Sequence, residues 1–270
     1  MDSTSVVITG AAAGIGRATA QRFLAAGYRV GAFDIDEKGL ASLARAAGPA
    51  ERGRLHTATL DVTDADAWRT GLAEFTETTG GTLGVLVNNA GLLSAGRLEE
   101  IPLAKQHAMV QVNVTGTING CYAAHTYLAA TPGARVINLC SASAIYGQPE
   151  LAVYGATKFA VRGLSEALDL EWRADGIRVT ALWPPFVDTG MLEGVTTGST
   201  RSLGVRLGPD DVAGKVVAVA GDRGLPGRLP AVLPRSVHRP VGTQARALFT
   251  AASVAPSWVL RQVNARISGV

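Results

Sequence analysis

The sequence predicts an α/β fold, a single doubly wound domain in which helices cover both faces of a parallel seven-stranded sheet. Short β-branched or apolar runs alternate with longer segments of helical period, the pattern of a parallel sheet with crossover helices. The early runs are apolar at successive residues, as strands buried on both faces are. With 270 residues, 47% hydrophobic and 17% charged, the chain is long and apolar enough for one large core, and a disordered chain is excluded.

Seven short runs are the expected strands, and four longer segments between them are the expected helices. The strands are residues 6–9, 30–33, 55–60, 85–88, 136–139, 179–183 and 231–233. The helices are residues 15–26, 65–78, 103–129 and 151–174. The last of these has the clearest helical period and is followed by Gly176, a helix-ending residue. The segment 103–129 contains Asn113 and Gly116, where we expect a bend.

We expect residues 1–235 to form the main part of the domain. Within it, residues 189–207 are rich in Gly, Ser and Thr with little period, which predicts a mobile loop. Residues 236–270 interleave apolar residues with arginine and are expected to be a helical extension of the same domain. Packing on the subunit or contact with another subunit is the simpler interpretation of this tail, and covering the pocket or resting on a membrane surface are the alternatives.

Composition excludes several classes of protein. The net charge is +3 and no run of Lys or Arg resembles a nucleic-acid arm, so no nucleic-acid partner is expected. Cys121 and Cys140 lie in apolar segments without metal-ligand spacing, which predicts buried free thiols and no metal site. The sequence has no secretory signal and no uninterrupted apolar run of about 18 residues, so we expect a cytoplasmic protein without an integral membrane segment.

A glycine-rich turn follows the first predicted strand. It reads Thr-Gly-Ala-Ala-Ala-Gly-Ile-Gly over residues 9–16, and a helix begins near Arg17. Glycine permits a tight turn in which backbone N–H groups approach a pyrophosphate, and the positive end of the helix favours that anion. The turn therefore predicts a Rossmann-type dinucleotide site, although such a turn taken alone also fits a plain strand–helix connection. The expected contacts are Gly10, Ala13, Gly14, Ile15 and Gly16.

Asp34 closes the second predicted strand, about 20 residues beyond the glycines. A carboxylate there accepts hydrogen bonds from the adenosine ribose hydroxyls and repels a 2′-phosphate, so NAD is favoured over NADP. The next residue is Ile35 and Ala13 precedes Gly14, so neither position holds a base for that phosphate. Taken alone, Asp34 also fits a solvated turn before Asp36.

Tyr154 and Lys158 lie four residues apart at the start of a predicted helix, one turn apart on one face. An ammonium group beside a phenol stabilises the phenolate and lowers the phenol's pKa from its usual value of about 10. We therefore expect Lys158 to lower the pKa of Tyr154. A Tyr-x-x-x-Lys pair by itself is common by chance and is usually structural.

In order and spacing, these motifs resemble the short-chain dehydrogenase/reductase family from residue 5 to about residue 235. No single motif is specific, but the ordered set is. The matching segments are residues 9–16, 60–62 (Leu-Asp-Val), 88–91 (Asn-Asn-Ala-Gly), 113–116, Ser141, 154–158 (Tyr-Gly-Ala-Thr-Lys) and Pro184 with Thr189.

The resemblance implies four catalytic roles. Tyr154 would be the general acid/base, and Ser141 would hydrogen-bond the substrate oxygen and orient it. Cys140 stands where many relatives have another serine, so Ser141 is the hydroxyl we assign. Lys158 would bind the nicotinamide ribose and lower the phenol's pKa. Asn113 would hold a water that links Lys158 to solvent.

The resemblance also implies cofactor contacts beyond the glycine-rich turn. Asp61 and Val62 would contact adenine, and Pro185 stands where the family usually has glycine after Pro184. Because proline lacks an N–H and fixes φ, we expect residues 185–189 to follow a different path beside the nicotinamide. The remaining contacts are Asn89, Ala90 and Gly91 near the adenosine, Val187 at the nicotinamide amide, and Thr189 at the carboxamide or pyrophosphate.

These features imply an NAD-dependent oxidoreductase that transfers a hydride between a nicotinamide and a hydrophobic secondary alcohol or ketone. A dinucleotide-sensing regulatory protein without turnover is the alternative, and the intact catalytic set argues against it. We expect a homotetramer or homodimer through the helices that start at residues 103 and 151. The expected pocket residues are Ser143, Ile145, Tyr146 and Met191, with Leu93, Gln148 and Trp183 beside them.

Overall fold

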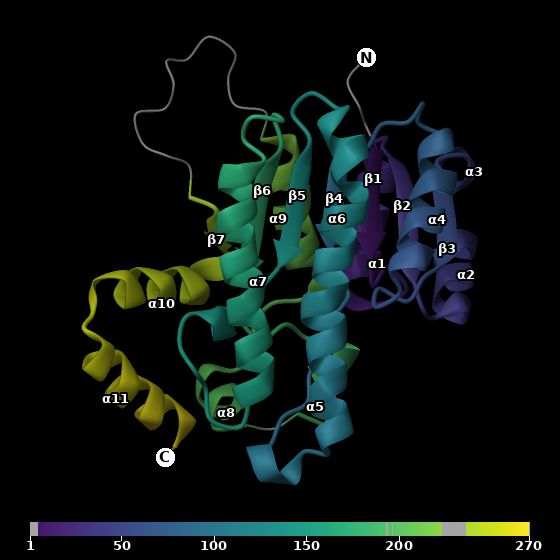
Figure 1. The fold of residues 1–270 in the computed structure, drawn as a ribbon. Coiled ribbons are helices and arrows are strands. Elements are labelled where there is room, and N and C mark those ends of the chain that lie inside the picture. The colour runs from purple at the N-terminus through teal and green to yellow at the C-terminus, as the bar shows by residue number, and fades with distance from the viewer. Residues whose placement is uncertain (1–4, 193, 196, 223–235, 270) are drawn as a thin grey trace.

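The protein is described by a computed structural model that covers residues 5–192, 194–195, 197–222 and 236–269. Its sheet has seven parallel strands in the order β3-β2-β1-β4-β5-β6-β7, so the predicted fold class is confirmed (Figure 1). The strands are β1 (Ser5–Thr9), β2 (Arg29–Asp34), β3 (Leu55–Thr59), β4 (Val85–Asn88), β5 (Arg135–Leu139), β6 (Arg178–Trp183) and β7 (His238–Pro240).

Helices cover both faces of this sheet (Figure 1). Side chains alternate along β1, so Val6 and Ile8 enter the core under α1 and α9, while Val7 enters the core under α4 and α6. The helices are α1 (Gly14–Ala25), α2 (Glu37–Ala46), α3 (Pro49–Arg52), α4 (Ala65–Glu77), α5 (Leu103–Val110), α6 (Gly116–Ala129), α7 (Ala152–Glu171), α8 (Gly198–Leu203), α9 (Pro209–Gly221), α10 (Gly242–Val254) and α11 (Ser257–Ser268).

The expected bend in residues 103–129 is a π-helix. The five residues Gln111–Thr115 form it between α5 and α6, and Asn113 lies at its centre. A π-helix inside an α-helix inserts one extra residue into a turn and is frequent at functional sites. It turns the Asn113 side chain toward α7, as the hydrogen bonds below show.

One expectation falls outside the described residues, and another differs from the structure. The seventh predicted strand, residues 231–233, and the predicted boundary at residue 235 lie outside the described residues. The sheet instead gains its seventh strand at His238–Pro240, where the Ala181 N–H donates to the Val237 carbonyl at 2.9 Å. Residues 189–207 are not irregular throughout, since they contain the 3-10 helix Gly190–Leu192 and helix α8.

The tail after the sheet is helical in its described part, where α10 and α11 form an arm beside α7 (Figure 1). Across the described ranges of the chain, no helix combines the length and the hydropathy needed to cross a membrane.

Candidate active site

A pocket lies at the carboxyl ends of β4, β5 and β6, where ligands bind in open parallel sheets. It brings Ser141, Tyr154 and Lys158 together with residues from the glycine-rich turn and the segment after β6. The residues that line it are Ile15, Asn89, Gly91, Leu93, Leu139, Cys140, Ser141, Tyr154, Lys158, Pro184, Pro185, Phe186, Val187, Thr189, Met191 and Leu192.

The glycine-rich turn is packed so tightly that only glycine fits at its end. A Cβ on Gly16 would lie 1.9 Å from the Gly10 carbonyl oxygen, and Gly10 itself adopts φ of +66°. Gly14 (φ +51°) lies beside Thr189, whose Cγ2 would be 3.4 Å from an added Cβ. Ala13 precedes α1 and gives it no side-chain cap, so the first N–H groups of the helix stay available to an anion.

Asp34 is fixed against this turn. Its carboxylate accepts a hydrogen bond from the Ala12 N–H at 2.9 Å and another from the Asp36 N–H at 3.0 Å. Ile35 beside it is 68% exposed. The structure therefore places a carboxylate next to the glycine-rich turn, as the position at the end of β2 suggests.

Asp61 and Val62 follow β3 and lie near Asp34 rather than near Tyr154. The Leu60 N–H donates to the Asp34 carbonyl at 2.9 Å, which ties the two strand ends together. Asp61 is exposed and accepts hydrogen bonds from the Thr63 N–H and hydroxyl at 2.9 and 2.8 Å. Val62 is buried, and its carbonyl accepts from Trp68 Nε1 at 3.1 Å.

Thr9 joins β1 to the residues after β4. Its hydroxyl accepts hydrogen bonds from the N–H groups of Asn89 and Ala90 at 3.0 and 3.1 Å, and Asn89 Nδ2 donates to the Thr9 carbonyl at 2.8 Å. Next along the chain, a Cβ on Gly91 would lie 3.3 Å from Asn113 Oδ1 and 3.9 Å from Lys158 Nζ. The residues 89–91 therefore link the glycine-rich turn to the catalytic side of the pocket.

Lys158 lies beneath the phenol of Tyr154, with its Nζ 5.6 Å from the ring centroid. The ammonium donates a hydrogen bond to the Leu139 carbonyl at 2.8 Å, and both side chains are buried. Burial raises the pKa of Tyr154 to about 12, against the opposing effect of a hydrogen bond with Ser141. Burial also lowers the pKa of Lys158.

Burial therefore outweighs the contacts that would lower the pKa of Tyr154 within the protein itself. The expected lowering of this pKa by Lys158 together with an oxidised nicotinamide ring stays a prediction. Desolvation disfavours the charged form of both groups, so it opposes the phenolate and the ammonium at once. A pKa raised to about 12 favours the protonated phenol of Tyr154 at neutral pH.

Asn113 connects the π-helix to the pocket wall. Its Oδ1 accepts from the Leu92 N–H at 2.7 Å, and its Nδ2 donates to the Leu92 carbonyl at 2.9 Å and to the Thr157 hydroxyl at 3.0 Å. Thr157 precedes Lys158 on α7, so Asn113 fixes the loop after β4 against the helix that holds Tyr154 and Lys158. Thr157 lies inside the Tyr-x-x-x-Lys motif, but its role has no signal in the sequence.

A chain of buried side chains leads away from Ser141. The Ser141 Oγ accepts from the Ser143 N–H at 3.1 Å and lies 3.2 Å from the Ser143 Oγ. The Ser143 hydroxyl donates to Gln148 Oε1 at 2.8 Å. Ser143 and Gln148 therefore position the Ser141 hydroxyl from behind, rather than lining the pocket themselves. Sequence reasoning placed Gln148 near the site but gave it no such role.

The expected substrate residues divide into two groups. Met191 and Leu93 line the pocket, as do Pro185 and Phe186, the second of which sequence reasoning missed. The remaining expected residues are not among the described residues that line this pocket. Ile145 packs against the cluster around Cys140, and Trp183 is fully buried against Phe249. Tyr146 is half-buried and burial raises the pKa of its phenol.

The segment after β6 runs past the pocket. The Pro184 carbonyl accepts from the Ala142 N–H at 3.0 Å, and Val187 pairs with Leu207 in an isolated β-bridge. The Thr189 hydroxyl lies 3.4 Å from the Val187 carbonyl. Pro184, Val187 and Thr189 thus reach the pocket as expected, and Pro185 lines it between them.

Cys121 and Cys140 are buried free thiols, as predicted. Burial raises the pKa of Cys140 to about 11 and that of Cys121 to about 12, so neither is a thiolate at neutral pH.

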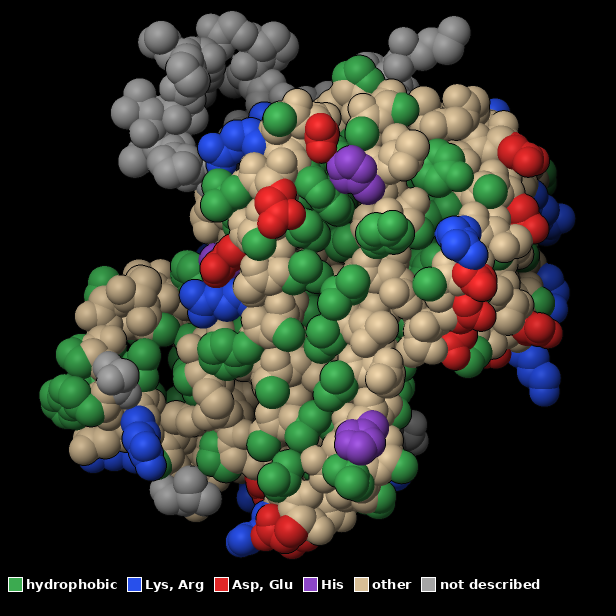
Figure 2. All heavy atoms as spheres, in the orientation of Figure 1, with side chains coloured by type: hydrophobic (Ala, Val, Ile, Leu, Met, Phe, Trp, Pro, Cys, Tyr) green, Lys and Arg blue, Asp and Glu red, His purple; other side chains and the backbone are tan. Residues whose placement is uncertain are grey.

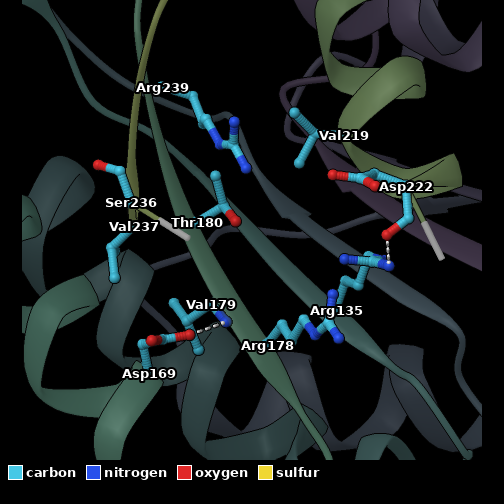
Figure 3. Close-up of a pocket in the computed structure, with 10 residues that line it drawn as sticks. All are labelled: Arg135, Asp169, Arg178, Val179, Thr180, Val219, Asp222, Ser236, Val237 and Arg239. Carbon is cyan, nitrogen blue, oxygen red and sulfur yellow. Dashed lines mark hydrogen bonds between the residues drawn. The ribbon is translucent and has the colours of Figure 1, made fainter. Parts of the chain in front are cut away.

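A second pocket lies at the opposite end of the sheet, where β5 and β6 begin (Figure 3). Arg135 donates a hydrogen bond to the Asp222 carbonyl there, and Asp169 accepts from the Val179 N–H at 3.2 Å. Because Tyr154 and Ser141 lie at the other end of the strands, this pocket is separate from the candidate active site.

Comparison with known proteins gives a family for this arrangement. The model of the short chain dehydrogenase family matches residues 4–200. The chain is 35% identical over 218 residues to the 3-alpha-(or 20-beta)-hydroxysteroid dehydrogenase of Mycobacterium tuberculosis, covering 80% of this chain and 82% of the relative.

Solved structures agree on the fold. The 3-ketoacyl-(acyl-carrier-protein) reductase from Brucella melitensis complexed with NADH matches with a TM-score of 0.76 and 25% identity, over 89% of this chain and 97% of that one. A short chain dehydrogenase from Burkholderia cenocepacia in complex with NADP matches with a TM-score of 0.79 and 21% identity, over 98% of each chain. The protein therefore belongs to the short chain dehydrogenase family and is an oxidoreductase whose fold binds a nicotinamide cofactor.

Proposed function

We propose that this protein is an NAD-dependent oxidoreductase that transfers a hydride between the nicotinamide and a hydrophobic secondary alcohol or ketone. The observation that carries the proposal is a single pocket into which Ser141, Tyr154 and Lys158 open beside Ile15 and Thr189. A proton donor, an oxygen-binding hydroxyl and the dinucleotide turn thus meet in one place. A protein that only sensed the dinucleotide would need only the last of these.

The described residues fit a nicotinamide dinucleotide. The cradle is formed by Gly14, which adopts φ of +51° beside Thr189, and by Gly91, where a Cβ would lie 3.3 Å from Asn113 Oδ1. Asp34 supports NAD over NADP, because a carboxylate held against the turn would repel a 2′-phosphate. When bound, the nicotinamide supplies or accepts the hydride, and its oxidised ring adds a positive charge near Tyr154.

Tyr154 acts as the general acid/base in this proposal. In ketone reduction the neutral phenol donates its proton to the substrate oxygen, and in alcohol oxidation the phenolate accepts the proton from the substrate hydroxyl. Ser141 hydrogen-bonds the same oxygen, in an orientation that Ser143 and Gln148 set. Lys158, held by the Leu139 carbonyl, keeps a positive charge beneath the phenol.

The lining of the pocket supports an apolar substrate. Leu93, Pro185, Phe186, Met191 and Leu192 surround the catalytic hydroxyls with few further polar groups. The Mycobacterium tuberculosis relative, a hydroxysteroid dehydrogenase by name, agrees with this chemical class. We therefore favour a bulky secondary alcohol or ketone over a small polar one.

We further propose a homo-oligomer through α6 and α7. These helices carry exposed large apolar side chains, among them Tyr122 at 84% and Leu170 at 64% exposure, with Ile118 and Phe159 beside them. Figure 2 shows hydrophobic side chains gathered over this face. A second copy would bury them.

The experiment follows NADH absorbance with a panel of bulky secondary alcohols, and it repeats each assay with NADP. We expect turnover with NAD and a preference for NAD that Asp34→Ser weakens at least about tenfold, because one charge is removed from the ribose site. Glu37→Gln is the matched control, an acid three residues away whose carboxylate accepts a hydrogen bond from the Thr59 hydroxyl at 3.4 Å. Turnover that prefers NADP in the wild type contradicts the cofactor proposal, and NAD binding without turnover on any alcohol supports the sensor instead.

A further inference from the structure

The C-terminal segment of the chain differs in charge from everything before it. All 22 acidic residues lie within residues 1–222, together with 18 of the 25 basic residues, so this part has a net charge of −4. Residues 223–270 hold the other seven basic residues, every one an arginine, and have a net charge of +7. Charge asymmetry of this kind points to an anionic partner.

The described part of this segment consists of strand β7 with its flanks and an arm made of α10 and α11, residues 241–269, which holds three of the seven arginines. Its inner side is packed: the Phe249 ring lies 5.3 Å from the Trp183 ring, and the Ser202 hydroxyl donates to the Ile267 carbonyl at 2.6 Å. A Cβ on Gly198 would lie 1.8 Å from the Ser268 carbonyl oxygen, so α8 and α11 touch backbone to backbone. The arm is therefore an ordered part of the fold and presents a fixed outer face.

The solvent-exposed side chains of the arm are both apolar and basic. On α10, Arg246 and Val254 are both exposed and lie eight residues apart, about 80° around the helix from one another. On α11, Trp258, Arg261 and Arg266 are exposed as well. Val254 is 81% and Trp258 is 65% exposed, and no carboxylate accompanies them anywhere in the arm. Figure 2 shows the arm bearing hydrophobic and basic side chains side by side.

We propose that the outer face of this arm docks on the surface of an anionic lipid bilayer. Tryptophan places an amphipathic ring at the headgroup level, and arginine binds phosphate oxygens in a bidentate manner. A helix pair with an apolar stripe, flanking arginines and no acids lies in the plane of such an interface. The apolar surface suited to a second copy is elsewhere, on α6 and α7, where Tyr122 and Leu170 are exposed.

The test measures co-sedimentation of the full chain with lipid vesicles, either of phosphatidylcholine alone or with phosphatidylglycerol added. We expect binding only to the anionic vesicles, weakened by added salt. Replacing Arg246, Arg261 and Arg266 together by glutamine should weaken binding on the order of a hundredfold, since each arginine near the surface contributes about fivefold. Replacing the exposed Arg29, Arg45 and Lys105 by glutamine is the matched control and should change binding less than about threefold.

Trp258 provides an independent readout. Trp68 and Trp183 are fully buried, and Trp172 is half-buried against His125. A blue shift of tryptophan emission on adding anionic vesicles should therefore come from Trp258, and it should vanish in Trp258→Phe but persist in Trp172→Phe. Circular dichroism of each variant checks that the arm stays helical. The proposal is overturned if the wild-type protein does not bind anionic vesicles, or if both triple variants lose vesicle binding equally. It is also overturned if the arm variant changes only the sedimenting mass of the protein, which would make the arm an interface between copies.

Discussion

The turn that ends at Gly16 permits a quantitative test, because its helical position would otherwise favour alanine. A Cβ there would lie 1.9 Å from the Gly10 carbonyl oxygen and 2.6 Å from Asn89 Nδ2. Ordinary contact needs about 3.5 Å, so the turn must open by roughly 1.5 Å. Overpacking of this kind destabilises the folded state by about 1–3 kcal/mol, and the higher helix propensity of alanine offsets only about 1 kcal/mol of this loss.

We therefore expect Gly16→Ala to lower the free energy of unfolding by up to about 2 kcal/mol and to weaken NAD binding roughly 10–100-fold. Urea unfolding and fluorescence titration with NADH measure the two effects. Gly53→Ala is the matched control, because Gly53 is exposed, has nothing within 4 Å of an added Cβ and adopts φ of −69°. It should leave NAD binding unchanged and stabilise the protein by about 0.5 kcal/mol. Equal NAD affinity in Gly16→Ala and the wild type would refute the reasoning.

Three further predictions rest on single contacts. Gln148→Leu removes the acceptor of the Ser143 hydroxyl and should lower kcat about tenfold with KM nearly unchanged. Gln148→Glu keeps an acceptor and should restore part of the rate. Equal losses of kcat in both variants would contradict the positioning role of Gln148. Because burial raises the pKa of Tyr154 to about 12, the rate of ketone reduction should stay constant between about pH 6 and 9. The rate of alcohol oxidation should rise with pH up to the apparent pKa of the enzyme with its cofactor bound. An oxidation rate that falls as the pH rises would contradict Tyr154 as the base. Gly198→Val should separate α8 from α11 and lower the free energy of unfolding by about 1–3 kcal/mol, as urea unfolding would show, and an unchanged value is inconsistent with the close approach to Ser268.

The buried strands and long helices were predictable because burial requires apolar side chains at a regular spacing along the sequence. β1, β4 and β5 are short apolar runs whose side chains fill the core on both faces, and the break at Asn113 stands out in an otherwise helical segment. The edge strand β7 has no such pattern, since His238–Pro240 becomes a strand only through its hydrogen bonds with β6. Tertiary contacts, not local propensity, decide that element.

Helix α8 was missed for a similar reason. Its sequence, rich in Gly, Ser and Thr, has weak helix propensity, but Thr197 caps its start, Glu150 Oε2 accepts from the Gly198 N–H at 2.8 Å, and α11 packs on it. The same limit applies to the candidate site. The residue types and order of the catalytic set could be predicted, but the pKa of Tyr154 depends on burial and the role of Gln148 depends on a contact through Ser143. Neither the burial of Tyr154 nor the contact through Ser143 can be inferred from the neighbouring residues in the sequence.

The central claim is that Tyr154 moves the proton during hydride transfer, and comparing Tyr154→Phe with the wild type tests it most directly. Loss of the hydroxyl should remove nearly all NADH formation from the best alcohol of the panel, about 100-fold or more, because the general acid/base is gone. NADH binding, followed by its fluorescence, should stay within about threefold, since the ring and Lys158 remain. Undiminished turnover in Tyr154→Phe, with the same affinity for NADH, would contradict the account.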